Sequence, residues 1–275
     1  MARPVVSRRR EVAGGSARSL LTTVLGEFVL PSGAPVWTAT LVDVLALFGV
    51  EEKAARQALA RTAAEGWLTS DRVGRRVRWS LTRPGRRLLA EGADRIYGFG
   101  SGDHPWDGRW LVLLVSVPET MRDLRHKLRT RLSWAGFGSP TAGVWITPHP
   151  DAEADAKLIL DELDLSAMSF LANYGALGRE RDMVASAWNL TEVADRYDEF
   201  IASFADLAPE DPDGVLRAQT LLVHEWRRFP FLDPQLPGDL LPARWSGTTA
   251  TTLFNDKHLR WKAPAQDRWA ELANA

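Results

Sequence analysis

The chain has 275 residues, 45% of them hydrophobic and 25% charged, which is the balance of an ordinary soluble globular protein. Its length predicts two or three domains of roughly 100–200 residues each. The absence of cysteine excludes disulfides, thiolate zinc sites and cysteine nucleophiles, and no apolar run approaches the roughly 18 residues of a membrane span. The N-terminus lacks the apolar segment of a secretory signal, so we expect a cytoplasmic protein without a membrane partner.

The net charge of −1 conceals an uneven distribution of charge along the chain. Residues 1–97 hold 16 Lys and Arg against 9 Asp and Glu, a net charge of +7. Residues 98–275 hold 18 against 26, a net charge of −8. A basic first part on an acidic body is typical of a protein that meets a polyanion with one domain.

The pattern of residues 1–97 predicts a DNA-binding fold. Residues 1–15 are polar and carry Arg8, Arg9 and Arg10, which predicts a disordered arm. Helical periodicity and breakers predict three helices and a hairpin over residues 16–30, 38–48, 51–65 and 67–81. Thr82 then caps a further basic helix. This order of parts predicts a winged helix-turn-helix domain over residues 16–97.

The third of these helices has the composition of a recognition helix. Its small inward residues allow close packing, and its opposite face carries Lys53, Arg56, Gln57 and Arg61. Arg56 and Gln57 are the expected base contacts, because Arg pairs with guanine and Gln with adenine in the major groove. The expected backbone contacts are Lys53 and Arg61 beside them and the hairpin arginines Arg72, Arg75 and Arg76.

The middle of the chain predicts a small α+β domain over residues 98–190. A Gly- and Pro-rich linker (98–107) is followed by alternating strands and helices at residues 110–117, 119–134, 136–147, 151–163 and 167–174, with Asp151 as a helix cap. The run is typical of a ferredoxin-like domain, although one strand is not accounted for. Trp110, Trp134 and Trp145 are expected in its core.

The remainder, residues 191–275, predicts a mainly helical C-terminal domain with helices at residues 192–207, 213–229 and 248–259. The overall fold class is therefore α+β in three domains. The five histidines are far apart and show no zinc-binding spacing, and no P-loop, dinucleotide or nucleophile-elbow motif appears. We therefore expect no catalytic site, no metal and no cofactor.

Several strings resemble the PaaX family of bacterial transcriptional repressors. They are WDGRW (106–110), VPETMRDLRHKLRTRLSWAGFG (117–138), GVWITP (143–148) and HEWRRFPFLDPQLPGDLLPARWSG (224–247). The segments ARQALARTAAEGWL (55–68) and GRRVRWSLTRPGRRLL (74–89) resemble the winged helix of that family. The resemblance covers about residues 16–260, and the last of the four strings is the most distinctive.

The resemblance implies a homodimeric repressor of a catabolic operon, above all one for phenylacetate degradation. Such a protein binds a palindromic double-stranded DNA operator and releases it when a CoA thioester binds, typically phenylacetyl-CoA. The middle domain of the family is similar to a ferredoxin-like nuclease of CRISPR adaptation, in which a metal-binding aspartate ends the first strand. Here Ser116 stands at that place, which argues against metal-dependent nuclease chemistry.

The aromatic and basic cluster in residues 224–247 has two interpretations. Its members are His224, Trp226, Arg227, Arg228 and Trp245. In the first interpretation the arginines bind the phosphates of an acyl-CoA and the tryptophans line an apolar slot. In the second, the cluster fixes the Pro-rich loop against the body of the protein.

The leading hypothesis is a ligand-responsive homodimeric repressor. The competing hypotheses are a nucleic-acid hydrolase that uses the ferredoxin-like domain and a constitutive DNA-binding protein without ligand control.

Overall fold

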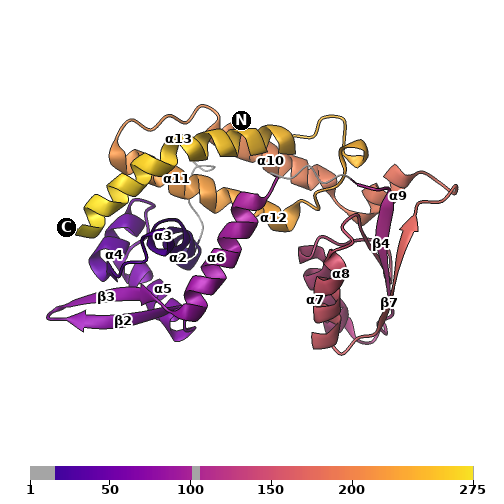
Figure 1. Ribbon diagram of the computed structural model, residues 1–275, viewed down its shortest axis with the longest axis horizontal. Coiled ribbons are helices and arrows are strands. Elements are labelled where there is room, and N and C mark those ends of the chain that lie inside the picture. The colour runs from indigo at the N-terminus through magenta and orange to yellow at the C-terminus, as the bar shows by residue number, and fades with distance from the viewer. Residues whose placement is uncertain (1–15, 101–105, 275) are drawn as a thin grey trace, which may run out of the picture. The chain divides into compact units, whose positions relative to one another are not determined.

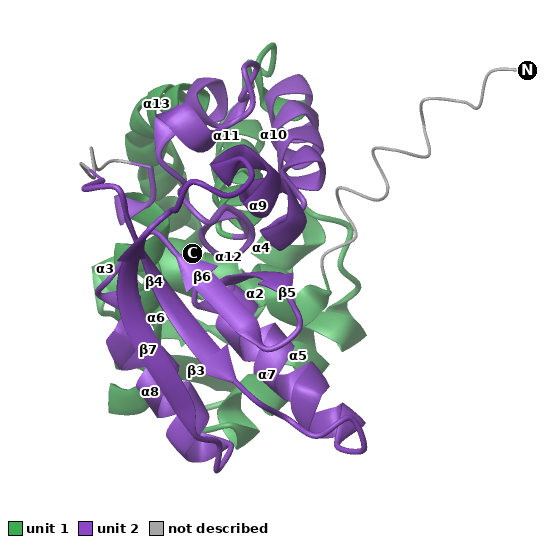
Figure 2. Ribbon diagram, turned by 90° about the vertical axis from the view of Figure 1, so that its right-hand side faces the viewer, with its two compact units in different colours: residues 1–97, 203–227, 252–275 green, residues 98–202, 228–251 purple. Residues whose placement is uncertain are grey.

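The structure, a computed structural model, describes residues 16–100 and 106–274 (Figure 1). The predicted arm over residues 1–15 and part of the predicted linker lie outside this range. The chain forms two compact units (Figure 2). Unit 1 comprises residues 1–97, 203–227 and 252–275, and unit 2 comprises residues 98–202 and 228–251.

Unit 1 begins with the three predicted helices. The first is α2 (Ala17–Val24), which continues through one π-helical turn, η1 (Leu25–Val29), into α3 (Leu30–Ser32). Ser16 caps it as predicted, because its Oγ accepts a hydrogen bond of 3.2 Å from the Ser19 backbone N–H. The other two helices are α4 (Thr38–Ala46) and α5 (Glu52–Ala64).

The predicted hairpin is present and belongs to a three-stranded sheet of order β1-β3-β2. Its strands are β2 (Leu68–Val73) and β3 (Arg76–Leu81), and Gly74 takes the left-handed conformation (φ 61°) at the turn. The third strand, β1 (Val36–Trp37), has two residues and is too short for a periodic pattern to predict. Helix α6 (Arg83–Gly98) follows, and Thr82 Oγ1 caps it by accepting from the Gly85 N–H at 3.1 Å.

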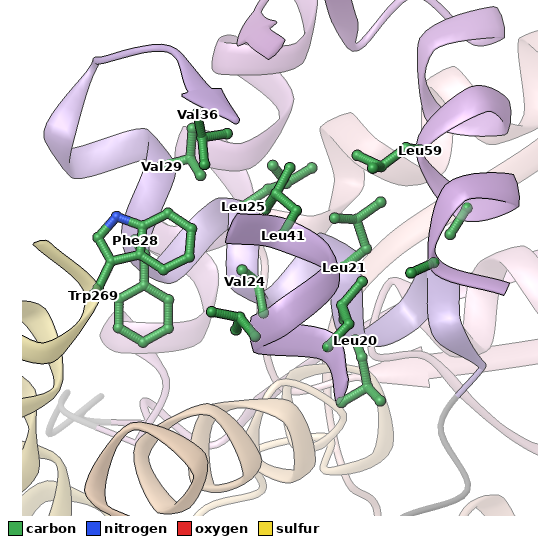
Figure 3. Packing of buried hydrophobic residues seen from close by; sticks show 14 of the residues in the cluster. Leu20, Leu21, Val24, Leu25, Phe28, Val29, Val36, Leu41, Leu59 and Trp269 are labelled. Carbon is green, nitrogen blue, oxygen red and sulfur yellow. The ribbon is translucent and has the colours of Figure 1, made fainter. Parts of the chain in front are cut away.

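Two helices from the end of the chain complete the core of unit 1. They are α11 (Pro212–Trp226) and α13 (Gly247–Asn274), of which residues 252–274 belong to this unit. Figure 3 shows Trp269 of α13 beside Phe28, and their rings stack with centroids 5.2 Å apart. Leu216 and Ala265 are fully buried in the same cluster. The sequence places the start of a separate C-terminal domain at residue 191, whereas the structure divides residues 191–275 between the two units.

Unit 2 contains the ferredoxin-like fold. Its elements are β4 (Arg109–Val115), α7 (Arg122–Trp134), β5 (Gly138–Thr141), β6 (Val144–Thr147), α8 (Ala152–Glu162) and β7 (Ala167–Asn173). The sheet order is β5-β6-β4-β7, and every neighbouring pair is antiparallel. The strand missing from the sequence prediction is explained here, because residues 136–147 form two short strands instead of one.

The sheet of unit 2 has different coverings on its two faces. On one face Leu111 and Leu113 pack with residues of α7 and α8. On the other face Trp110 and Ile146 pack with Val184 of α9 (Glu180–Ala187) and Leu240 of η2 (Gly238–Leu240). The remaining helices are α10 (Leu190–Phe204) and α12 (Phe229–Leu232).

Two sequence expectations for unit 2 are wrong in detail. Trp110 and Trp145 are buried as predicted, but Trp134 is 62% exposed. It lies at the end of α7, turned away from the buried Leu128 and Leu132, and its ring meets Phe231 edge-on at 6.4 Å. Asp151 stands at the N-cap position of α8, but its side chain makes no capping hydrogen bond.

Candidate nucleic-acid interface

Helix α5 presents a continuous polar face to solvent. Its inward residues Ala55, Ala58 and Leu59 are at most 3% exposed and pack into the core of unit 1. At 3.6 residues per turn the opposite side carries the predicted DNA-binding residues, and all of them are exposed: Lys53, Arg56, Gln57 and Arg61. The structure therefore leaves this face free to enter a major groove, whose width admits a helix.

Arg56 makes an ion pair along its own helix. Its Nε lies 2.7 Å from Glu52 Oε1, one turn earlier, and both side chains are more than half exposed. Such exposed pairs are worth about 0–1 kcal/mol. The pair can therefore orient the guanidinium in the free protein and be exchanged for a base edge at little cost.

The three hairpin arginines differ in their surroundings. Arg76 lies over the ring of Trp37, 4.4 Å from its centroid, a cation–π contact that joins the start of β3 to β1. Arg72 Nε donates to the carbonyl of Gly74 at 3.2 Å, which closes the tip. Arg75 is exposed within the turn itself. Arg72 and Arg75 thus place positive charge at the end of the hairpin.

Helix α2 fixes the position of α5 relative to the hairpin. Arg18 of α2 forms an ion pair with Glu65 at the end of α5, and its guanidinium lies 5.8 Å from the ring centroid of Trp67, just before β2. Thr82 Oγ1 donates to the Trp67 carbonyl oxygen at 3.2 Å. The recognition helix and the wing are therefore joined through α2 and the turn at residues 65–67.

Unit 1 also contains a buried polar cluster, where the π-helical turn meets α11 and α13. Glu27 is 4% exposed and accepts hydrogen bonds from the Tyr97 hydroxyl and, at 2.7 Å, from Gln219 Nε2. Burial raises the pKa of Glu27, although both hydrogen bonds and the charge of Lys262 oppose this shift. Burial, and then the charge of Glu27, raises the pKa of Tyr97.

His258 belongs to the same cluster and is neutral there. Gln219 Nε2 also lies 2.7 Å from His258 Nδ1, so this ring nitrogen accepts a hydrogen bond and carries no proton. The ring stacks with Tyr97 (5.0 Å) and Phe254 (5.5 Å). Burial and the nearby charge of Lys262 lower the pKa of His258 to about 4.

The predicted effector-binding residues are divided between the two units. His224 Nδ1 lies 2.9 Å from Thr23 Oγ1, and Arg227 donates to Ser19 Oγ, so both residues contact α2. Trp226 is fully buried and stacks on Phe254 at 4.5 Å. Arg228 and Trp245 belong to unit 2, where Trp245 meets Tyr197 edge-on at 5.6 Å.

Comparison with known proteins agrees with this arrangement. Three family descriptions match successive parts of the chain: PaaX-like protein at residues 16–85, the PaaX protein central Cas2-like domain at 103–184 and the PaaX-like protein C-terminal domain at 188–271. The transcriptional repressor PaaX of Escherichia coli (strain K12) is 34% identical over 254 residues, which cover 86% of this chain and 78% of that protein. The chain belongs to the PaaX family.

The fold of this PaaX family member also matches a solved structure. The uncharacterized protein Rv0674 from Mycobacterium tuberculosis superposes with a TM-score of 0.60 over 90% of this chain and 97% of that one. At 22% identity this likeness concerns the fold alone.

Ser116 follows β4 directly and is exposed. Among the residues that the structure describes, no three His, Asp or Glu side chains are grouped so as to hold a metal ion. Likewise, no helix within the described ranges is long and apolar enough to cross a membrane.

Sequence reasoning missed the cluster around Glu27. One signal was present, because Glu27 lies on the apolar stripe of the first helix together with Leu20, Val24 and Phe28. A charged residue at such a position requires buried partners. Those partners, Tyr97 and Gln219, lie 70 and 192 residues further along the chain, and no local pattern identifies them.

We predict that Arg56→Ala weakens binding to the native operator by about 1–3 kcal/mol and relaxes its base preference, because a bidentate base contact is lost. Arg87→Ala is the matched control, since Arg87 forms an equivalent exposed i,i+4 pair with Glu91 on α6. Arg75→Ala is expected to reduce the salt slope by about one unit with the base preference unchanged. Fluorescence anisotropy on operator and mutated duplexes measures these effects. Equal binding by Arg56→Ala and the wild type would remove Arg56 from the recognition surface.

The depressed pKa of His258 predicts a loss of stability in mild acid. The folded pKa of about 4 lies below the ordinary value of 6.5, so the contribution of this group is complete above pH 6.5 and lost as the pH falls towards 4. The raised pKa of Glu27 acts in the opposite sense, because it removes stability as the pH rises above 4.5.

Comparison of the wild type with His258→Gln isolates the histidine effect. Between pH 7 and pH 5 the wild-type Tm should fall further than that of the variant, by about 2–4 °C for each kcal/mol of difference. His126→Gln, which replaces an exposed histidine, is the control and should follow the wild type. Parallel Tm curves for the wild type and His258→Gln would contradict a neutral His258 in the fold.

Proposed function

We propose that this protein is a transcriptional repressor. Its winged helix reads a palindromic operator, and a CoA thioester lowers its affinity for that operator. The observation that carries the proposal is the exposed outer face of α5, with Arg56 and Gln57 beside an arginine-tipped wing. A recognition helix supplies base contacts, while wing arginines supply phosphate contacts that position it. The relation to an Escherichia coli repressor supports the same function.

A second copy of the chain is the proposed partner, since a palindrome presents two equal half-sites. The sheet of unit 2 supports this proposal, because part of the face opposite α7 and α8 is open. Met168 and Phe170 of the edge strand β7 pair with Leu114 and Val112, so all four share that face. Met168 is 60% exposed and Phe170 50%, which is unusual for large apolar side chains on a sheet.

The contacts of α11 with α2 suggest how a ligand would act. Arg227 bonds Ser19 and His224 bonds Thr23, so the end of α11 holds the helix that also positions α5. A thioester phosphate that engaged Arg227 would compete with Ser19. Such a ligand would favour an arrangement in which α2 is held differently and, if that arrangement binds DNA less well, would release the operator. The assignment of Arg228, Trp226 and Trp245 to the effector site stays a prediction, and full burial of Trp226 does not favour direct contact.

A nucleic-acid hydrolase is the second candidate, on the ground that the middle domain matches a Cas2-like family. Ser116 stands where the resemblance places a metal-binding aspartate, and this observation favours the regulator. Cleavage of labelled DNA or RNA in Mg²⁺, abolished by a chelator, would establish the hydrolase.

A titration of DNA binding tests the proposal. The probe is duplex DNA taken from upstream of the genes that neighbour the gene of this protein. Its binding to the protein is measured with and without phenylacetyl-CoA. We expect selective binding to one palindromic segment and an affinity lowered at least tenfold by the thioester, but by neither free CoA nor phenylacetate. A binder that ignores every acyl-CoA tested would be a constitutive DNA-binding protein, and absence of selective binding would overturn the repressor itself.

Two variants test the route through Arg227. Arg227→Ala removes the cation and the bond to Ser19, whereas Ser19→Ala removes the same bond and keeps the cation. We expect Arg227→Ala to lose the response to phenylacetyl-CoA and Ser19→Ala to retain it. If both variants respond like the wild type, Arg227 does not hold the thioester.

The open sheet face predicts the effect of charge on assembly. The double variant Met168→Asp, Phe170→Asp should sediment as a monomer and bind a full palindrome no better than a half-site, because carboxylates would be buried in the interface. Leu259→Asp is the control, since Leu259 is an 82% exposed apolar residue on α13. A dimeric double variant would place the interface elsewhere.

A further inference from the structure

Helix α7 concentrates positive charge in an otherwise acidic part of the chain. Its 13 residues include five basic ones and one acid, Asp123. The basic residues are Arg122, Arg125, Lys127, Arg129 and Arg131. Residues 98–275 as a whole carry a net charge of −8, so the helix has the opposite sign from the region that contains it.

Three of the arginines form a stripe on one side of α7. Arg122, Arg125 and Arg129 are spaced i, i+3 and i+7, which places them on one helix face. The buried Leu128 and Leu132 are directed at the sheet and adjoin this face, because they follow Arg125 by three and seven residues, so the stripe borders the buried side of α7. All three arginines are exposed, and the stripe extends about 10 Å along the axis at 1.5 Å per residue. We call these three residues the α7 arginine stripe.

The stripe differs from the neighbouring basic residues in how its side chains are paired with acids. Arg131 is engaged by Glu162 of α8, which ties the two helices together. Arg125 has only a loose pair, with Nη1 4.0 Å from Oε1 of Glu119, a side chain that is 93% exposed. Solvated helix faces elsewhere in unit 2 pair cations with acids one turn away, as Lys157 does with Asp161.

Within the stripe the neighbours one turn away are other arginines. Arg125 has Arg122 at i−3 and Arg129 at i+4. Like charges at these spacings destabilise a helix, so the stripe weakens α7 in the absence of an anion. Guanidinium groups bind phosphate in a bidentate manner, and spaced arginines on a rigid helix match a line of phosphates.

We propose that the α7 arginine stripe is a second DNA contact, which binds backbone phosphates of the duplex without reading bases. This inference rests on the proposed function, since it requires a DNA-bound protein. The remainder of unit 2 is acidic and is repelled by DNA, whereas the stripe is attracted to it. The contact adds affinity and salt dependence but no sequence preference.

The test uses the full-length protein with Arg122→Gln, Arg125→Gln and Arg129→Gln combined. Anisotropy titrations from low to moderate salt compare the operator in a long duplex with a scrambled duplex of equal length. We expect the salt slope to fall by about two to three units, at about 0.9 per phosphate contact. Affinity for both duplexes should fall at least tenfold, and the ratio between them should stay as in the wild type.

A charge-matched control separates a local contact from net charge. Lys157→Gln, Arg179→Gln and Arg196→Gln remove three cations from exposed ion pairs of the same unit. This control should bind DNA nearly as the wild type does. Equal losses in both triple variants would overturn the stripe as a contact and indicate a general charge effect.

Other outcomes also decide the question. An unchanged salt slope in a folded stripe variant, confirmed by circular dichroism, would overturn the inference. Intact DNA binding with a lost response to phenylacetyl-CoA would assign the stripe to ligand phosphates and overturn it as well. If wild-type protein shows no selective DNA binding, the proposed function fails first, and Arg56→Ala distinguishes that case because it then changes nothing.

Discussion

The stacking of Trp269 on Phe28 is the contact on which unit 1 depends. It places the last helix of the chain in the core of the first domain, beside the fully buried Leu216 and Ala265. Removing a buried Trp or Phe side chain costs about 3–5 kcal/mol, a large share of the stability of an ordinary domain. The winged helix is therefore not a separable module on a tether, because its core is completed by residues about 240 positions away.

The same docking also brings polar groups together inside unit 1. Glu27 lies in the π-helical turn of the first helix and is satisfied by Tyr97 and Gln219. π-Helical turns interrupt regular helices and frequently occur at functional sites. A buried carboxylate is tolerated only while all its partners are in place, so the cluster admits a narrow set of arrangements of α2, α6, α11 and α13.

Helix α2 contacts both the end of α5 and the end of α11 through residues within two turns of each other. Arg18 holds the end of α5, while Ser19 and Thr23 hold the end of α11. A displacement of α11 therefore has a short physical path to the recognition helix, along one rigid element. Coupling over this path requires no change within α5 itself.

The sequence predicted what depends on local pattern. The periodicity of α5 placed Ala55 and Leu59 inward and Arg56 and Gln57 outward, and burial in the structure agrees. Strand β1 was missed because two residues show no period. Strands β5 and β6 were merged because each has only four residues and Pro140 weakens the first as a strand signal. Trp134 was misplaced because its size suggested a core, whereas its helical position decides its exposure.

Long-range pairing was outside the reach of sequence patterns. Trp37 beneath Arg76, and Gln219 beside both Glu27 and His258, join segments separated by 39 to 192 residues. The proposed base-reading and phosphate-binding residues lie on different elements. The excess of basic residues in positions 1–97 predicted only part of this division. Under the proposed function, base-reading groups gather on one helix, where a single substitution is expected to change preference, whereas the proposed phosphate-binding groups are spread over several elements. Because phosphate contacts contribute through released counterions, their effects accumulate with number, and a regulator can lower its occupancy by moving a few of them without altering what it reads.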